Sequence, residues 1–212
     1  MTSDDSHRHK RDKHYKKAKK EGYRARSAYK LIDIQNKFNI FKRAFYILDI
    51  GSAPGSWLQV ARKYAEENIE KYRDKYYHRN EYRILGVDIN KVSPIENVET
   101  IKLDATKPEF KDKIISYFGD KLDLLLSDAS INKSGNKFAD HVKQIRLCYH
   151  ILDLGKEFLK YKGNMVIKCF QGTDFKDFYD NFKKEFKFGK AYKPKASKKK
   201  SNEIYLIGID KI

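Results

Sequence analysis

Short runs of consecutive apolar residues alternate along this chain with stretches in which apolar residues recur every three or four positions. The runs are typical of strands buried in a parallel sheet, and the periodic stretches are typical of helices that cover such a sheet. The predicted strands cover residues 44–50, 84–88, 98–104, 122–128, 165–170 and 203–209. Two helices are predicted to begin near Ser27 and Leu58, and three more to cover residues 108–118, 139–161 and 174–186. This alternation predicts an α/β fold with a Rossmann-like, doubly wound sheet.

The first 22 residues break the pattern, because they are polar and contain no apolar stripe that could offset the entropy of ordering. We therefore expect a basic flexible arm over residues 1–22 and a single domain over residues 23–212, a usual size for one α/β domain. No stretch approaches the ~20 consecutive apolar residues that span a bilayer, so we expect no membrane partner.

The two cysteines bear on the compartment. Cys148 and Cys169 lie in apolar periodic runs rather than in a C-x-x-C pair, which argues against a disulfide framework and a cysteine metal site. We expect no bound metal and an intracellular, reducing compartment. The sequence leaves the cytoplasm, the nucleus or nucleolus, and an organelle open, and a monomer is the expected state.

Charge is concentrated at two places in the chain. The net charge is +17, with 11 basic and 4 acidic residues in residues 1–30 and 7 lysines without an acid in residues 187–200, which leaves only +3 for the rest. Such a distribution favours a polyanionic partner such as nucleic acid, and flexible solubilising tails are the alternative.

A turn with two glycines, G-S-A-P-G-S-W over residues 51–57, follows the first predicted strand. Ligands of open parallel sheets bind beyond the carboxyl ends of the strands, where such a turn brings bare backbone close to the ligand. The turn lacks the G-x-G-x-x-G pattern of dinucleotide sites, which disfavours a pyrophosphate. Asp88 and Asp104 end later strands, and their carboxylates suit a ribose diol and an adenine amino group. A nucleoside without phosphates indicates S-adenosylmethionine, and helix capping by these acids is the alternative.

Five segments together resemble the FtsJ-type ribose 2′-O-methyltransferases, in the branch that acts on large-subunit ribosomal RNA. The segments are residues 21–31, 48–57, 126–128, 166–172 and 193–205. The resemblance covers nearly the whole chain and implies the S-adenosylmethionine-dependent methyltransferase fold, a mostly parallel seven-stranded sheet with an antiparallel terminal strand. It implies S-adenosylmethionine as cofactor, RNA as partner, and a catalytic tetrad on Lys30, Asp128, Lys168 and Glu203.

The cofactor contacts that the resemblance implies are Gly55, Trp57, Asp88, Asp104 and Asp128. We expect their neighbours Gly51, Ala53, Pro54, Ser56, Ile89 and Ala105 to join them. The expected contacts to the RNA backbone are Arg24, Arg26, Lys193, Lys195 and Lys198. The chain departs from the family pattern at Ser56, where a second glycine is frequent, in residues 129–132, which lack a common proline, and in the longer stretch of residues 66–83.

A ribose 2′-hydroxyl must lose its proton as it attacks a methyl group in line, so the site needs a base and rigid alignment. Lys168 is the candidate base. In an alternative of equal physical merit, Lys168 steers the hydroxyl lone pair and water takes the proton. Asp128 and Glu203 are assigned to orienting the two lysines of the tetrad.

Two other classes of function would be expected to show different features in the sequence. A catalytically silent RNA-binding protein would be expected to lack members of the tetrad, and all four are present. A nicotinamide-dependent oxidoreductase would be expected to carry G-x-G-x-x-G. Enzymes that methylate transfer RNA or the messenger RNA cap share the site, so the RNA stays open.

Overall fold

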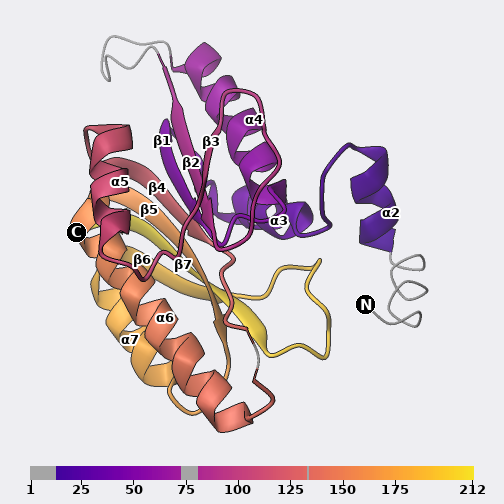
Figure 1. Ribbon diagram of the computed structural model, residues 1–212, viewed down its shortest axis with the longest axis vertical. Helices are drawn as coiled ribbons and strands as arrows, with labels where there is room; N and C mark the ends of the chain where they lie inside the picture. The colour runs from indigo at the N-terminus through magenta and orange to yellow at the C-terminus, as the bar shows by residue number, and fades with distance from the viewer. Residues whose placement is uncertain (1–12, 73–80, 133) are drawn as a thin grey trace.

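Seven strands form one sheet in a computed structural model that describes residues 13–72, 81–132 and 134–212 (Figure 1). The strands are β1 (Tyr46–Ile50), β2 (Arg83–Asp88), β3 (Glu99–Lys102), β4 (Leu122–Ser127), β5 (Leu159–Phe170), β6 (Phe186–Tyr192) and β7 (Glu203–Lys211). Their order is β3-β2-β1-β4-β5-β7-β6. The pairs from β3 to β5 are parallel, and β7 runs antiparallel to both β5 and β6. The predicted sheet is thereby confirmed.

Helices cover both faces of the sheet. The described helices are α2 (Lys13–Lys20), α3 (Ala28–Phe38), α4 (Ser56–Lys71), α5 (Glu109–Phe118), α6 (Lys137–Phe158) and α7 (Phe175–Lys184). Leu48 of β1 packs into the cluster with α5, α6 and α7, and its neighbour Ile47 packs into the cluster with α3 and α4. Because successive side chains of a strand point to opposite faces, burial of both faces requires the continuous apolar runs of the sequence. No described helix has the length and apolar character of a membrane span.

The boundaries differ most from the prediction in two places. Strand β6 was expected to be the end of a helix and a basic segment, because Lys187 and Lys190 interrupt its apolar pattern. Lysines are common on edge strands, where they discourage pairing with other chains, and β6 is such an edge. The long helix α6 ends at Phe158 rather than at residue 161, and β5 begins at Leu159 rather than at residue 165, because Leu159 already pairs with Leu122 in the sheet.

The amino-terminal arm also differs from the prediction over its described part. Residues 13–20 form helix α2, whose Ala18 is buried against Tyr29 of α3 and Ala196 of the loop between β6 and β7. One alanine gives no visible apolar stripe, and the packing surface comes from distant segments. The two basic regions of the sequence therefore touch each other. Residues 1–12 of the expected arm lie outside the described residues.

Candidate active site

The four residues of the expected tetrad meet at one edge of the sheet. Asp128 directly follows β4, and Lys168 lies near the end of the neighbouring strand β5. Because β7 is antiparallel to β5, its first residue, Glu203, reaches the same edge. Lys30 comes from the first turn of α3. The sheet order thus brings together side chains that are far apart in the sequence.

Two ion pairs form within the tetrad. Lys30 Nζ lies 2.7 Å from Glu203 Oε1, and Lys168 Nζ lies 3.3 Å from Asp128 Oδ1. Lys168 also donates to the backbone carbonyl of Asp128. The exposed fractions of these four side chains lie between 9% and 20%. Charges that are this well shielded from water attract more strongly than a surface pair, so the geometry is held firmly.

A residue missed by the sequence analysis joins the two pairs. The Tyr205 hydroxyl donates to Asp128 Oδ1 at 2.7 Å and accepts from Lys30 Nζ at 3.1 Å. Burial, and then the carboxylates of Asp128 and Glu203, raise the pKa of Tyr205 well above its ordinary value, so the hydroxyl remains a donor. Tyr205 is two residues after Glu203 on one strand, and such residues share a face. That spacing could have identified it.

A pocket of about 650 Å³ opens beside the tetrad. Seven of the expected cofactor residues line it: Gly51, Ala53, Asp88, Ile89, Asp104, Ala105 and Asp128. Its remaining wall includes side chains of α6 that the sequence analysis did not select: Lys143, Arg146, Leu147 and His150. Pro54, Gly55, Ser56 and Trp57 are not among the lining residues.

The two strand-end carboxylates in this pocket are fixed in different ways. Asp88 accepts the backbone N–H of Ala53 at 2.9 Å through one oxygen and that of Asn90 at 2.7 Å through the other. Asp104 accepts both the backbone N–H and the hydroxyl of Thr106 through a single oxygen, Oδ1. These bonds from Thr106 lower the pKa of Asp104, so its carboxylate is charged and keeps Oδ2 for a ligand donor.

The turn at residues 51–57 needs its glycines for reasons of packing. Gly51 has a φ of +79°, and a Cβ there would lie 2.5 Å from the Cα of Ala129 in the loop after β4. Gly55, with a φ of +105°, caps α4. The Trp57 side chain is buried, and its indole N–H donates to the backbone carbonyl of Ser27 at 2.9 Å. The side chains of Ser56 and Trp57 are therefore held by Ser27, and only the backbone N–H groups of this first helical turn could serve a ligand.

These donors and acceptors fit S-adenosylmethionine. The Asp88 carboxylate suits the ribose diol, and the free oxygen of Asp104 suits an adenine amino group. The apolar side chains of Ile89 and Ala105 line the space between these carboxylates. The first turn of α4 has N–H groups and a positive dipole end, which suit the carboxylate of the methionine part.

The five expected RNA contacts fall into two groups. Lys195 and Lys198 are exposed on the loop between β6 and β7. Lys193, in contrast, donates to backbone carbonyls of its own loop, those of Lys199 and Ser201. Arg24 turns its guanidinium onto backbone carbonyls around the cofactor turn. Arg26 is half-buried.

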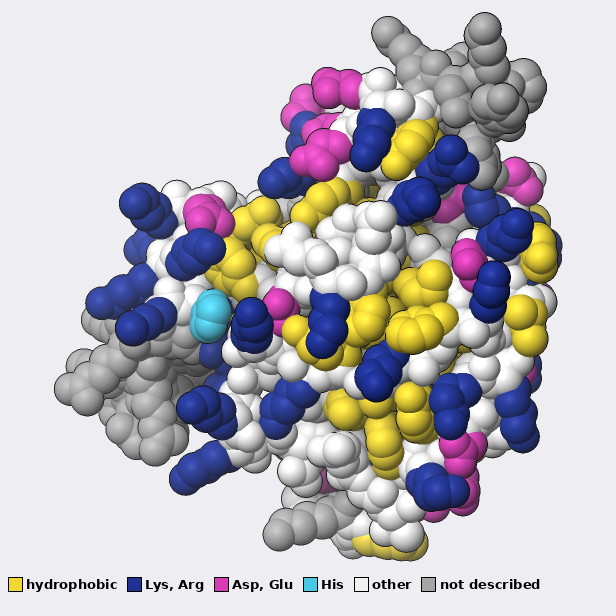
Figure 2. Space-filling view, turned by 180° about the vertical axis from the view of Figure 1, so that it is seen from behind, with side chains coloured by type: hydrophobic (Ala, Val, Ile, Leu, Met, Phe, Trp, Pro, Cys, Tyr) yellow, Lys and Arg dark blue, Asp and Glu magenta, His cyan; other side chains and the backbone are white. Residues whose placement is uncertain are grey.

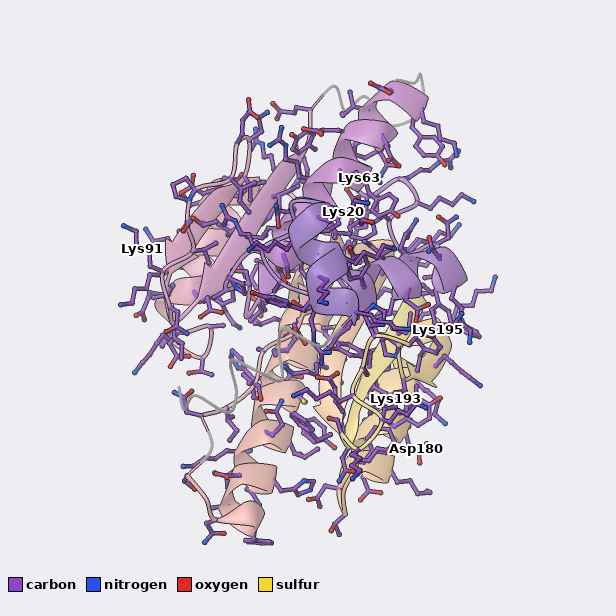
Figure 3. All side chains as sticks on the ribbon, turned by 90° about the vertical axis from the view of Figure 1, so that its right-hand side faces the viewer. Lys20, Lys63, Lys91, Asp180, Lys193 and Lys195 are labelled. Carbon is purple, nitrogen blue, oxygen red and sulfur yellow. The ribbon has the colours of Figure 1, made fainter. Side chains whose placement is uncertain are left out.

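The exposed lysines form a broad basic surface. Lys20 of α2 lies on the same side of the molecule as Lys193 and Lys195 of the loop (Figure 3). On the face behind that of Figure 1, Lys and Arg side chains lie around patches of hydrophobic side chains (Figure 2). Glu203 connects this surface to the tetrad, because its Oε1 accepts the hydroxyl of Ser197 from the same loop at 2.9 Å.

Comparisons with known proteins agree with this geometry. Residues 23–211 match the model of the FtsJ-like methyltransferase family. The protein named Ribosomal RNA large subunit methyltransferase E from Methanothrix thermoacetophila is 41% identical over 201 residues, which cover 95% of this chain and 73% of that protein. Its namesake from Methanobrevibacter smithii is 37% identical over 204 residues, covering 95% of this chain and 90% of that protein.

Solved structures show the same fold. A crystal structure from Plasmodium falciparum, described as that of a ribosomal RNA methyltransferase, has a TM-score of 0.74 and 30% identity, covering 89% of this chain and 98% of that chain. Fibrillarin from Aeropyrum pernix, solved with bound S-adenosyl-L-methionine, has a TM-score of 0.51 and 16% identity over 88% of this chain and 75% of that chain, a likeness of fold. On the family match and these relatives, the chain belongs to the FtsJ-like methyltransferases.

Proposed function

We propose that this chain transfers a methyl group from S-adenosylmethionine to a ribose 2′-hydroxyl in large-subunit ribosomal RNA. The observation that carries the proposal is the meeting of Lys30, Asp128, Lys168 and Glu203 at the edge of a pocket that fits the cofactor. The family supports methyl transfer, and the names of the relatives support ribosomal RNA.

S-adenosylmethionine would supply an electrophilic methyl group. Asp128 lies both in the tetrad and in the wall of the pocket, so the attacking hydroxyl belongs beside it. The Lys168 ammonium donates to the backbone carbonyl of Asp128 and forms an ion pair with its Oδ1, and an ammonium has three donors. We assign its remaining N–H to the 2′-hydroxyl oxygen, whose lone pair it would direct at the methyl group while water takes the proton. The bonds from Tyr205 and Lys168 keep Asp128 in place for this step.

The basic surface supports RNA as the substrate. Lys195 and Lys198 lie on the loop whose Ser197 contacts the tetrad, so a strand held by that loop would pass the catalytic edge. Complete pairing of the tetrad disfavours a catalytically silent RNA-binding protein. Transfer RNA and the messenger RNA cap are the competing substrates, and the relatives' names favour ribosomal RNA over both.

Two measurements test the proposal. Calorimetry should show binding of S-adenosylmethionine, and tighter binding of NAD would contradict the cofactor assignment. Mapping of ribose methylation across total RNA, with and without the protein, should show one or a few sites lost from large-subunit ribosomal RNA. Loss confined to transfer RNA or to messenger RNA caps would replace the substrate and leave the chemistry unchanged.

A further inference from the structure

Arg24 lies in the segment that joins α2 to α3, within the basic amino-terminal region of residues 1–30. Its place in that region made it an expected RNA contact. Although Arg24 is exposed, both of its terminal nitrogens bond to the protein: Nη1 donates to the carbonyl of Ser93 at 2.6 Å and to that of Pro54 at 3.2 Å, and Nη2 donates to that of Pro94 at 2.7 Å.

The three carbonyls belong to two different loops at the cofactor pocket. Pro54 lies in the turn after β1, and Ser93 and Pro94 lie in the segment after β2, whose first residues Ile89 and Asn90 line the pocket beside Asp88, the last residue of β2. The turn is joined to this region once more, by the bond from the Ala53 N–H to Asp88. The guanidinium therefore bridges the two loops on which the cofactor contacts depend.

The backbone around Arg24 is attached to the same region. The Arg24 N–H donates to Gln59 Oε1 of α4 at 2.9 Å, and Gln59 Nε2 donates to the carbonyl of Gly22 at 2.9 Å. The Ser27 and Ser56 hydroxyls lie 2.8 Å apart. These bonds fix the origin of the Arg24 side chain, so its fork approaches the carbonyls in one orientation.

Gly55 provides the space through which the guanidinium passes. A Cβ at Gly55 would lie 2.7 Å from Arg24 Nη1, closer than real Cβ atoms approach other heavy atoms. A side chain here would therefore displace Arg24 in addition to straining a backbone with a φ of +105°. Arg24 is therefore one reason why the cofactor turn needs a glycine at position 55.

We infer that Arg24 is a positioning residue for the cofactor pocket, which holds the turn after β1 against the segment after β2, and that it is not a contact to RNA. The inference rests on the proposed function, since it takes S-adenosylmethionine as the ligand. The planar fork serves all three carbonyls at once: Nη1 is shared between Pro54 of the turn and Ser93 of the segment after β2, and Nη2 adds a bond to Pro94.

The test compares Arg24→Ala and Arg24→Lys with Lys195→Ala, which removes an exposed cation of the basic loop (Figure 3). Calorimetry measures the dissociation constant of S-adenosylhomocysteine. Fluorescence anisotropy at several salt concentrations measures the affinity for a single-stranded RNA. Denaturant unfolding without ligand checks that each variant is folded, and Arg24→Lys carries the test if Arg24→Ala is not.

We expect both Arg24 variants to bind S-adenosylhomocysteine about tenfold more weakly, as loss of charged hydrogen bonds implies, and to keep the salt slope of RNA binding. Lys195→Ala should do the reverse, flattening the slope by about 0.7 for one lost phosphate contact and keeping the cofactor affinity. If the Arg24 variants keep cofactor affinity within twofold of wild type and flatten the slope, the inference is overturned. If wild type itself does not bind S-adenosylhomocysteine, the proposed function fails and the inference fails with it.

A double-mutant cycle tests the role of Gly55 separately. Gly55→Ala should weaken cofactor binding less in the Arg24→Ala background than in wild type, because the added Cβ no longer meets Nη1. Equal losses in both backgrounds would show that Gly55 is needed for its φ and for its contacts with Val92 and Ile95, and would overturn the inferred packing against Arg24.

Discussion

The tetrad and the basic surface both depend on lysines, and they use them in opposite ways. Within the tetrad each lysine faces a carboxylate, Lys30 at Glu203 and Lys168 at Asp128, and the side chains are at most 20% exposed. On the loop between β6 and β7, Lys195 and Lys198 stand in solvent, in a segment without acidic residues.

The two kinds of lysine can serve different purposes: one fixes a reacting atom in place, and the other adds to an electrostatic field. A paired, shielded lysine is held at one place, so it can direct a reacting atom, and its attraction for distant charges is largely cancelled by its partner. An exposed, uncompensated lysine has no fixed position, yet it adds to a field that attracts phosphates and is screened by salt. Substitutions in the two regions should therefore affect different measurements.

The largest effect is expected at Lys168. Lys168→Ala removes the group that aligns the hydroxyl, so single-turnover methylation should slow by ~10²–10⁴ with little change in cofactor or RNA affinity. Lys168→Arg should recover little activity, since a planar guanidinium does not reproduce the geometry of an ammonium. Near wild-type turnover of Lys168→Ala, together with a slow Lys30→Ala, would reverse the roles of the two lysines.

A smaller effect is expected at Asp88, a charged group that is held in place in the cofactor pocket, as the tetrad lysines are at the catalytic edge. Asp88→Ala removes a charged acceptor for the ribose diol and the bond that holds Ala53, so cofactor binding should weaken by ~1–3 kcal/mol. Calorimetry with S-adenosylmethionine measures it. Asp153→Ala, on the exposed face of α6, serves as control and should leave the affinity unchanged. Equal affinities for Asp88→Ala and wild type would place the ribose elsewhere.

The electrostatic role of the exposed lysines is tested by the salt dependence of RNA binding. If the surface neutralises ~5 phosphates, binding of single-stranded RNA should have a log-log salt slope of about −3 to −4. The double variant Lys195→Gln with Lys198→Gln should flatten this slope by about 1.4, since each phosphate contact contributes about 0.7. Lys102→Gln with Lys113→Gln removes the same charge from β3 and α5 and is the matched control. If both pairs flatten the slope equally, net charge alone attracts the RNA.

One buried carboxyl, that of Asp49, belongs to neither of the two compared regions. Asp49 of β1 is fully buried, and neither of its oxygens accepts a hydrogen bond from the described residues. Burial, and then the carboxylates of Asp128 and Asp88, raise the pKa of Asp49 well above its ordinary value. The folded chain keeps a proton that the unfolded chain releases, so this group lowers stability as the pH rises above about 4.

Asp49→Asn removes that titration and has the smallest expected effect, confined to stability. The free energy of unfolding of the variant relative to wild type should increase from pH 5 to pH 8, as measured by urea unfolding at both values. Asp153→Asn is the exposed control. A difference that stays constant over this range would show that Asp49 does not hold its proton in the folded chain.

The sequence was sufficient where burial is dense and insufficient where it is partial. The central strands were predicted because both faces of the sheet are covered, which makes their apolar runs continuous. The tetrad was predicted through the resemblance to the FtsJ-type family. Strand β6 was missed because lysines interrupt its apolar pattern, as is usual on an edge strand. Helix α2 was missed because its buried contact with the protein comes from a single alanine. Arg24 looked like an RNA contact because carbonyl partners leave no trace in a sequence.

The last strand of the sheet has a consequence for the order in which the chain is made. Strand β7 lies between β5 and β6, and it supplies Glu203 and Tyr205 to the catalytic edge. A ribosome completes β7 after all other strands, and until it inserts, β5 lacks its antiparallel neighbour and Lys30 lacks its carboxylate. Since chains grow at roughly 5–20 residues per second, the growing polypeptide passes through a stage in which Lys30, Asp128 and Lys168 are present and the catalytic edge is still incomplete. Catalytic competence therefore arrives with β7, when one strand completes the sheet and the site together.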